Sequence, residues 1–135
     1  MKNRALPPRS TLGELMPVKH SHEIEAKPVA AGKDTTIQVL ISAQEAPNFA
    51  LRKFSMQKGG GMPRHTNSLE HEQYVLRGEA IITIGDETHH VKAGDVVFIP
   101  EGAAHSYQNT GDELFEFLCI VPNKEDEITI VGEEC

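Results

Sequence analysis

The stretch that decides the fold of this chain is residues 59–78, GGGMPRHTNSLEHEQYVLRG, which places His65, Asn67 and His71 close together. A second stretch, residues 94–109, GDVVFIPEGAAHSYQN, adds His105 after a Pro-Gly turn. Residues two apart on a strand point to the same side, so His65 and Asn67 should face together. Neutral imidazole suits zinc, iron, copper, nickel and manganese. The pattern therefore predicts either a metal site or a cleft of hydrogen-bonded histidines without a metal.

The two stretches resemble the paired motifs of the cupin superfamily, written G-x5-H-x-H-x3,4-E-x6-G and G-x5-P-x-G-x2-H-x3-N. The second motif is complete, with its fixed positions at Gly94, Pro100, Gly102, His105 and Asn109. The first motif matches at Gly59, His65 and Gly78. It departs from the pattern at Asn67, where a histidine is expected, and at His71, where a glutamate is expected. The chain is similar to small bacterial single-domain cupins of the cupin 2 type with a histidine-rich metal site.

This resemblance implies an all-β fold, a jelly-roll β-barrel in a single domain. It also implies a site for one divalent transition metal ion, such as manganese, iron, nickel or zinc. The ion would be held by His65, His71 and His105, with Asn67 adding a weak amide ligand or holding a bound water. Three protein ligands leave positions open for water or substrate, which is the layout of a catalytic rather than a structural metal site.

The order of short segments along the chain leads to the same fold class without the motifs. Short strands separated by Gly and Pro turns, with no convincing helix, indicate an all-β barrel or jelly roll. We expect an irregular N-terminal arm over residues 1–34, on which His20 and His22 are solvated. The barrel should span residues 35–122, with a glycine-rich loop at 58–63. An acidic tail, residues 123–135, contains ITIV and could add an edge strand.

Alternation along the predicted strands selects the side chains that should line a substrate pocket. Arg52 shares a face with apolar neighbours, so it could bind a substrate carboxylate bidentately or form a structural ion pair. Gln73 should lie beside His71, and Tyr107 beside His105. Two residues of the strand near 115–121 complete the predicted pocket, Phe117 and Cys119, although Cys119 could instead be a small core residue.

Composition excludes several classes of partner. The formal net charge is −7, which disfavours nucleic acid. No apolar run is long enough for a membrane-spanning helix, and residues 1–10 lack the apolar stretch of a signal peptide, so we expect a cytoplasmic protein. Leu114, Leu118 and Ile120 form a second apolar face that must be covered by the N-terminal arm or by another subunit. We expect a homodimer.

For function, we expect a metal-dependent, oxygenase-type enzyme that acts on a small organic substrate. A non-redox isomerase or lyase, or a small-ligand binding module without turnover, would use the same pocket. No side chain predicted beside the site is a good base at neutral pH, which favours chemistry at the metal. Catalytic residues beyond the metal ligands are not assigned by the sequence.

Overall fold

The computed structural model describes residues 17–131, and strands dominate this part of the chain. One short 3-10 helix precedes ten strands, and no helix in the described residues has the length and apolarity to cross a membrane. The elements in order are η1 (Ser21–Glu23), β1 (Lys27–Pro28), β2 (Lys33–Ile41), β3 (Phe49–Asn67), β4 (His71–Arg77), β5 (Glu79–Ile84), β6 (Glu87–Lys92), β7 (Val96–Ile99), β8 (His105–Gln108), β9 (Phe115–Pro122) and β10 (Ile128–Ile130).

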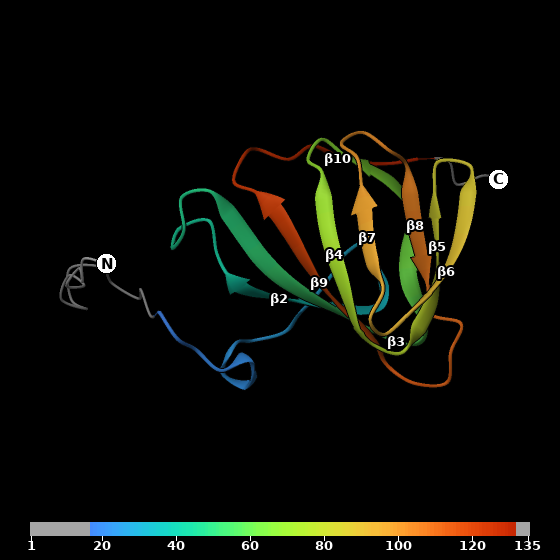
Figure 1. Cartoon of the computed structure of the whole chain (residues 1–135), viewed down its shortest axis with the longest axis horizontal. Coiled ribbons are helices and arrows are strands. Elements are labelled where there is room, and N and C mark those ends of the chain that lie inside the picture. The colour runs from blue at the N-terminus through green and yellow to red at the C-terminus, as the bar shows by residue number, and fades with distance from the viewer. Residues whose placement is uncertain (1–16, 132–135) are drawn as a thin grey trace.

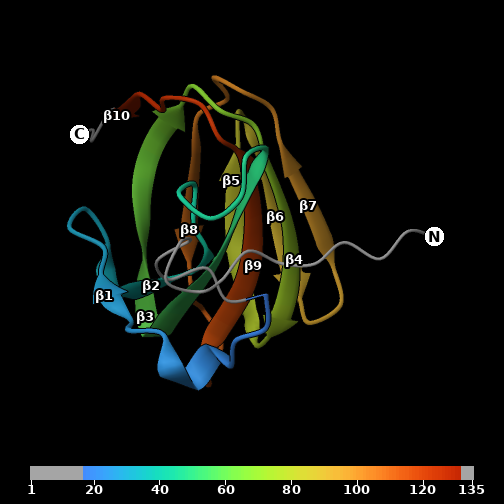
Figure 2. The same ribbon diagram turned by 90° about the vertical axis from the view of Figure 1, so that its left-hand side faces the viewer.

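Strand β3 joins the two sides of the curled sheet (Figures 1 and 2). Its first half pairs with β2 and β9, and β9 continues through β4 to β7. Its second half pairs with β8 and β10, and β8 continues through β5 to β6. All of these pairings are antiparallel. The sheet curls back on itself, and the predicted jelly-roll barrel is confirmed.

The predicted glycine-rich loop at residues 58–63 is wrong, because this stretch is the middle of β3. Gly59 has a φ of +81°, a conformation that glycine adopts readily and that lets the strand change direction. At Gly61 a Cβ atom would run into the carbonyl oxygen of Tyr107 on β8. The glycines therefore bend a continuous strand and admit a close backbone neighbour. A strand of this kind has the same glycine-rich composition as a loop.

The interior of the barrel is filled as strand alternation predicts. On β9 the inward residues Phe115, Phe117, Cys119 and Val121 are all buried, whereas Ile120 between them is 40% exposed. Met56, Val75, Ile82 and Ile99 from four other strands pack in the same core. Each of these residues faces inward because successive side chains of a strand point to opposite sides.

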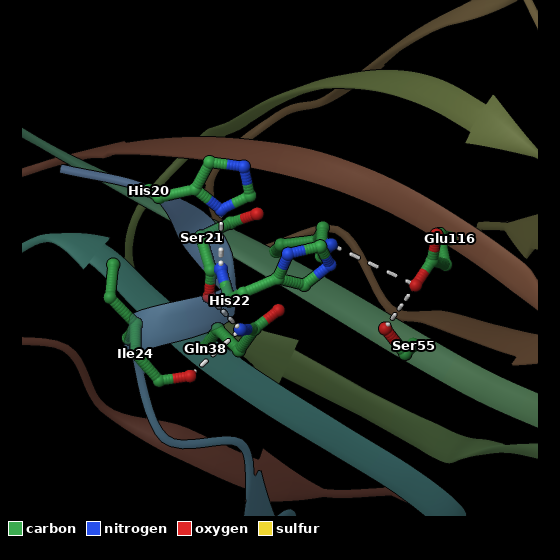
Figure 3. Close-up of polar contacts among 8 residues, drawn as sticks. His20, Ser21, His22, Ile24, Gln38, Ser55 and Glu116 are labelled. Carbon is green, nitrogen blue, oxygen red and sulfur yellow. Dashed lines mark hydrogen bonds and ion pairs between the residues drawn. The ribbon is translucent and has the colours of Figure 1, made fainter.

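The part of the N-terminal arm around η1 packs against β2 through Gln38 (Figure 3). The side-chain amide of Gln38 donates hydrogen bonds to the carbonyl oxygens of Ser21 at 2.8 Å and Ile24 at 2.9 Å. His20 and His22 stack on each other with ring centroids 4.5 Å apart, and both are exposed, as expected for solvated side chains. The first sixteen residues of the predicted arm lie outside the described residues.

Within residues 17–131, a large part of the outer sheet surface is open. Cross-strand partners share a face, so Leu118 of β9, Tyr74 of β4 and Val96 of β7 form one outward row. Tyr74 is 47% exposed and Val96 75% exposed. Phe98 and Ile120 belong to the next row, at 55% and 40% exposure. Glu72 of β4 stands between Phe98 and Ile120 in that row, so the outer face of β9, β4 and β7 is a largely apolar surface around one carboxylate, with no cover in the described chain.

Candidate functional site

A pocket of about 180 Å³ opens inside the barrel, where both sequence motifs converge. Its polar lining comes from Arg52, His65, Asn67, His71, Gln73, His105 and Tyr107. Its apolar lining includes Phe54, Met62, Phe117 and Ile128. A larger hollow of about 450 Å³ lies between the arm and β2, but no histidine lines it. The smaller pocket holds the candidate chemistry.

Sheet pairing brings the three predicted histidines into one place. His65 on β3 is the direct cross-strand partner of His105, the first residue of β8, and their ring centroids are 4.2 Å apart. His71 opens β4, and its ring lies 5.8 Å from that of His105. The turn before β8 is joined to the first motif by a hydrogen bond from the Gly102 N–H to the Asn67 carbonyl oxygen at 2.8 Å. This bond holds the two motifs together.

Hydrogen bonds to the backbone set the tautomers of two of these histidines. The Nδ1 atom of His65 lies 2.8 Å from the Pro63 carbonyl oxygen, and that of His105 lies 2.9 Å from the Ala103 carbonyl oxygen. A carbonyl oxygen can only accept, so each Nδ1 carries the proton and each neutral ring keeps its lone pair on Nε2. His105 Nε2 is buried without a hydrogen-bond partner. Both rings therefore offer Nε2 to a ligand.

His71 is the most weakly anchored of the three, because neither of its buried ring nitrogens has a hydrogen-bond partner. Burial, reinforced by the nearby Arg52 charge and His105, lowers the pKa of His71 to about 3. Burial likewise lowers the pKa of His105 to about 4. Both rings are neutral at physiological pH, which is the form that binds a metal ion.

Arg52 brings a positive charge into the pocket and forms no ion pair with another residue of the described chain. Its Nη2 contacts Cys119 Sγ at 3.4 Å, and its guanidinium carbon lies 5.2 Å from the centre of the Phe54 ring. Its Nε is buried without a hydrogen-bond partner. Of the two interpretations open from the sequence, a structural ion pair finds no support within residues 17–131, where no carboxylate lies within 4 Å of the guanidinium. The guanidinium is available to an anion.

A second polar group lies on the wall formed by β4, β8 and β9. Gln73 Nε2 donates to the Tyr107 hydroxyl at 2.7 Å, and Gln73 Oε1 is buried without a partner. Burial raises the pKa of Tyr107, so its hydroxyl stays protonated. The Tyr107 ring stacks on Phe117 with centroids 5.1 Å apart. Cys119, predicted as a pocket residue, is fully buried behind Arg52 and Gln73 and does not line the pocket.

The sequence did not single out Asp126, which reaches the site from the C-terminal segment. Its Oδ2 accepts a hydrogen bond from Asn67 Nδ2 at 2.9 Å. Asn67 Oδ1 is left buried without a partner. The sequence pointed to this segment only through the acidic tail with its short apolar run at 128–131. That pattern does not predict how the run pairs with β3, and the pairing is what brings Asp126 to Asn67.

The buried, unpartnered atoms test whether a metal ion fits these residues. Imidazole nitrogens of His71 and His105 and the amide oxygen of Asn67 all lack partners, and these are donor types that transition ions accept. Among residues 17–131, no three His, Cys, Asp or Glu side chains already stand in metal-holding geometry. The donor chemistry therefore fits an ion, although the three rings do not stand in a closed ligand geometry in the described residues.

Comparison with known proteins assigns the family. The sequence profile of the cupin domain matches residues 52–121, which contain both motifs. The chain belongs to the cupin family. This cupin aligns with the "Oxalate-binding protein" of Thermotoga maritima at 32% identity over 94 residues, 67% of this chain and 78% of that protein.

Solved structures agree with this assignment. The polyketide cyclase RemF from Streptomyces resistomycificus superposes with a TM-score of 0.81 at 29% identity, covering 89% of this cupin and 88% of that chain. A predicted oxalate decarboxylase from Thermotoga maritima superposes with a TM-score of 0.70 at 26% identity, covering 78% and 97%. The predicted membership of the small single-domain cupins is confirmed.

Proposed function

We propose that this cupin is a metal-dependent enzyme that binds a small organic carboxylate beside a divalent transition ion. The observation that carries the proposal is the convergence of an unpaired guanidinium, Arg52, and the unpartnered ring nitrogens of His71 and His105 on one pocket. Each buried polar atom without a partner costs roughly 1–3 kcal/mol. A metal ion would accept the lone pairs of the ring nitrogens, and a carboxylate would pair with the guanidinium, so the two together would remove these costs.

His65, His71 and His105 would hold the ion, manganese, iron, nickel or zinc, and Asn67 Oδ1 would face it as a neutral oxygen. An ion held by neutral ligands keeps its full positive charge and supplies Lewis acidity toward oxygen atoms of a substrate. The backbone hydrogen bonds on Nδ1 of His65 and His105 keep Nε2 available and fix the ring orientation.

The pocket favours a small anion with a flat body. Arg52 would bind a carboxylate bidentately. Gln73 Oε1 would accept a hydrogen bond from a substrate hydroxyl, and the ring of Phe117 supplies an apolar wall. A pocket volume of about 180 Å³ limits the ligand to a small molecule. The similarity to a protein named for oxalate binding supports an anionic ligand of this size.

For the reaction, we place the non-redox class before the oxygenase class that the sequence favoured. The described pocket holds no side chain suited to act as a strong general base, since burial keeps the Tyr107 hydroxyl protonated. Activation of the substrate by the bound ion as an electrophile therefore fits best, and both reaction classes would use it. The similarity to a structure named as a polyketide cyclase is our reason for putting the non-redox class first. Turnover that requires O2 would return the protein to the oxygenase class.

The test of the anion site is a titration of Co²⁺-loaded protein with oxalate and with its neutral analogue oxamide. We expect Arg52→Gln to weaken oxalate binding by roughly 10–100-fold, because a hydrogen bond to a charged group contributes about 1.5–3 kcal/mol. Lys53→Gln is the matched control, since Lys53 points to the outer face beside Glu116. Equal binding of oxalate by wild type and Arg52→Gln, or of oxamide and oxalate by wild type, would overturn the proposal.

We also propose that the protein is a homodimer through the outer face of β9, β4 and β7. Large apolar side chains on neighbouring strands, Tyr74, Val96, Phe98 and Ile120, are 40–75% exposed there. Exposed apolar side chains gathered in this way, here on both sides of Glu72, mark an interaction site. A second copy of the chain supplies the same apolar face and buries both.

A further inference from the structure

The C-terminal segment crosses the mouth of the candidate metal pocket. Strand β10 pairs antiparallel with the end of β3, placing Ile128 opposite Asn67 and Ile130 opposite His65. Ile128 lines the pocket. The segment is held by hydrogen bonds at both ends, from the Ser68 N–H to the Glu127 carbonyl oxygen at 3.2 Å and from the Val131 N–H to the Arg64 carbonyl oxygen at 2.9 Å. The tail is therefore part of the site.

Asp126, at the start of this segment, uses both carboxylate oxygens as acceptors. Its Oδ2 accepts from Asn67 Nδ2 at 2.9 Å. Its Oδ1 accepts from the Ser68 N–H at 2.9 Å and from the Ser68 hydroxyl at 3.2 Å. An ionised carboxylate can only accept hydrogen bonds, so the amide atom of Asn67 that faces it must be the NH2 group.

This contact decides what Asn67 presents to the pocket. With the NH2 group turned to Asp126, the amide oxygen is buried, has no partner and belongs to a side chain that lines the pocket. The opposite orientation would put an NH2 group there, which repels a cation and has no lone pair to donate to it. The orientation of a single amide thus separates a ligating pocket from a non-ligating one.

We infer that Asp126 is a positioning residue that holds the Asn67 amide with its oxygen toward the bound ion. The inference deepens the proposed function, on which it rests. The negative charge behind the NH2 group also polarises the amide and increases the electron density on its oxygen, as carboxylates do behind metal-binding histidines. The positioning role of Asp126 also explains how an asparagine can serve where the motif has a histidine. An amide needs an external partner to fix its orientation, and Asp126 is that partner.

The test is a Co²⁺ titration of the full chain, in which binding is measured by calorimetry and by the absorption of the bound ion. Asn67 and the Ser68 N–H contact different oxygens of Asp126, so in Asp126→Asn one of these two donors faces an NH2 group instead of an acceptor. We expect Co²⁺ affinity to fall by roughly 10–100-fold, the usual effect of removing an outer partner of a metal ligand. Ser68→Ala is the matched control for fastening of the tail, since it removes the Ser68 hydroxyl that contacts Asp126 and accepts from the Glu127 N–H at 2.8 Å, and leaves the Asn67 contact in place.

The decisive variant is the exchange Asn67→Asp with Asp126→Asn. It keeps the net charge, reverses the direction of the hydrogen bond and returns an oxygen to the pocket. We expect it to regain at least the wild-type affinity, because a carboxylate at position 67 presents an oxygen to the pocket while its other oxygen accepts from the amide at position 126. Asp126→Asn that binds like wild type, or an exchange variant as weak as Asp126→Asn, would show that Asp126 only fastens the tail, and would overturn the inference.

Failure of the proposed function has a different signature, namely wild-type protein that binds no Co²⁺. The positioning role is then read from the side-chain NH2 signals of Asn67 in the ligand-free protein by nuclear magnetic resonance. We expect a protected proton in wild type and in Ser68→Ala that loses its protection in Asp126→Asn. Identical Asn67 signals in wild type and Asp126→Asn would overturn the inference even in that case.

Discussion

Acid should destabilise the ligand-free protein through the two buried histidines, before carboxylates are protonated. In the folded protein, burial lowers the pKa of His71 to about 3 and that of His105 to about 4, against 6.5 for the free side chain. Between these values the unfolded chain binds protons that the folded chain cannot bind. Stability contributed by the neutral rings is therefore full above pH ~6.5 and is lost as the pH falls toward ~4.

The size of the effect follows from the same values. For a group with a pKa of about 3 when folded and 6.5 when unfolded, the free energy of unfolding falls by about 2 kcal/mol between pH 7 and pH 5. The His105 shift gives a similar loss, so the two together remove about 4 kcal/mol. Small domains are stable by only about 5–15 kcal/mol in total, so the change is large enough to measure.

The assay is urea unfolding followed by circular dichroism, with a chelator present, at several pH values between 7 and 5. His71→Leu should lose about half of the pH dependence, because one of the two titrating groups is gone. His89→Gln should keep all of it, since His89 is exposed on β6. An unchanged pH dependence in His71→Leu would refute the argument that burial holds His71 neutral.

Three further outcomes are expected. Gly61→Ala should lower the free energy of unfolding by several kcal/mol, about 2–4, because its methyl group meets the Tyr107 carbonyl oxygen; a melting temperature equal to wild type would contradict this. Asn67→His should bind Co²⁺ more tightly than wild type, since it adds a fourth imidazole, and an equal or weaker affinity would show that position 67 does not face the ion. Wild type should scatter light as a dimer of the 14.9 kDa chain and Phe98→Lys as a monomer; a monomeric wild type would refute the dimer.

Local pattern was sufficient for the fold and for most of the pocket. Alternation on β9 placed Phe117 inward, and the two motifs assigned His65 and His105 to one site, where their ring centroids lie 4.2 Å apart on paired strands. These predictions succeeded because they depend on the two-residue repeat of a strand and on turns that glycine and proline fix locally.

Features that depend on contacts distant in the sequence were missed. Residues 58–63 are a bent strand because β8 approaches Gly61 closely, which composition cannot reveal. Asp126 lies 59 positions from Asn67 in the sequence, and only the register of β10 brings it to the amide. Whether a carboxylate lies beside Arg52 likewise depends on which side chains the neighbouring strands place around it. Each of these is decided by register and packing rather than by local sequence.

The metal content of the protein tests the central claim most directly. Wild-type protein purified without added metal, His105→Ala and His89→Ala should be compared by plasma emission spectroscopy. We predict about one divalent transition ion per chain in wild type and in His89→Ala, and a loss of most of it in His105→Ala, which removes a ring whose Nε2 is free to ligate. Wild-type protein that carries no such ion and takes up none on reconstitution, or a metal content unchanged in His105→Ala, would contradict the assignment of this pocket as a metal site.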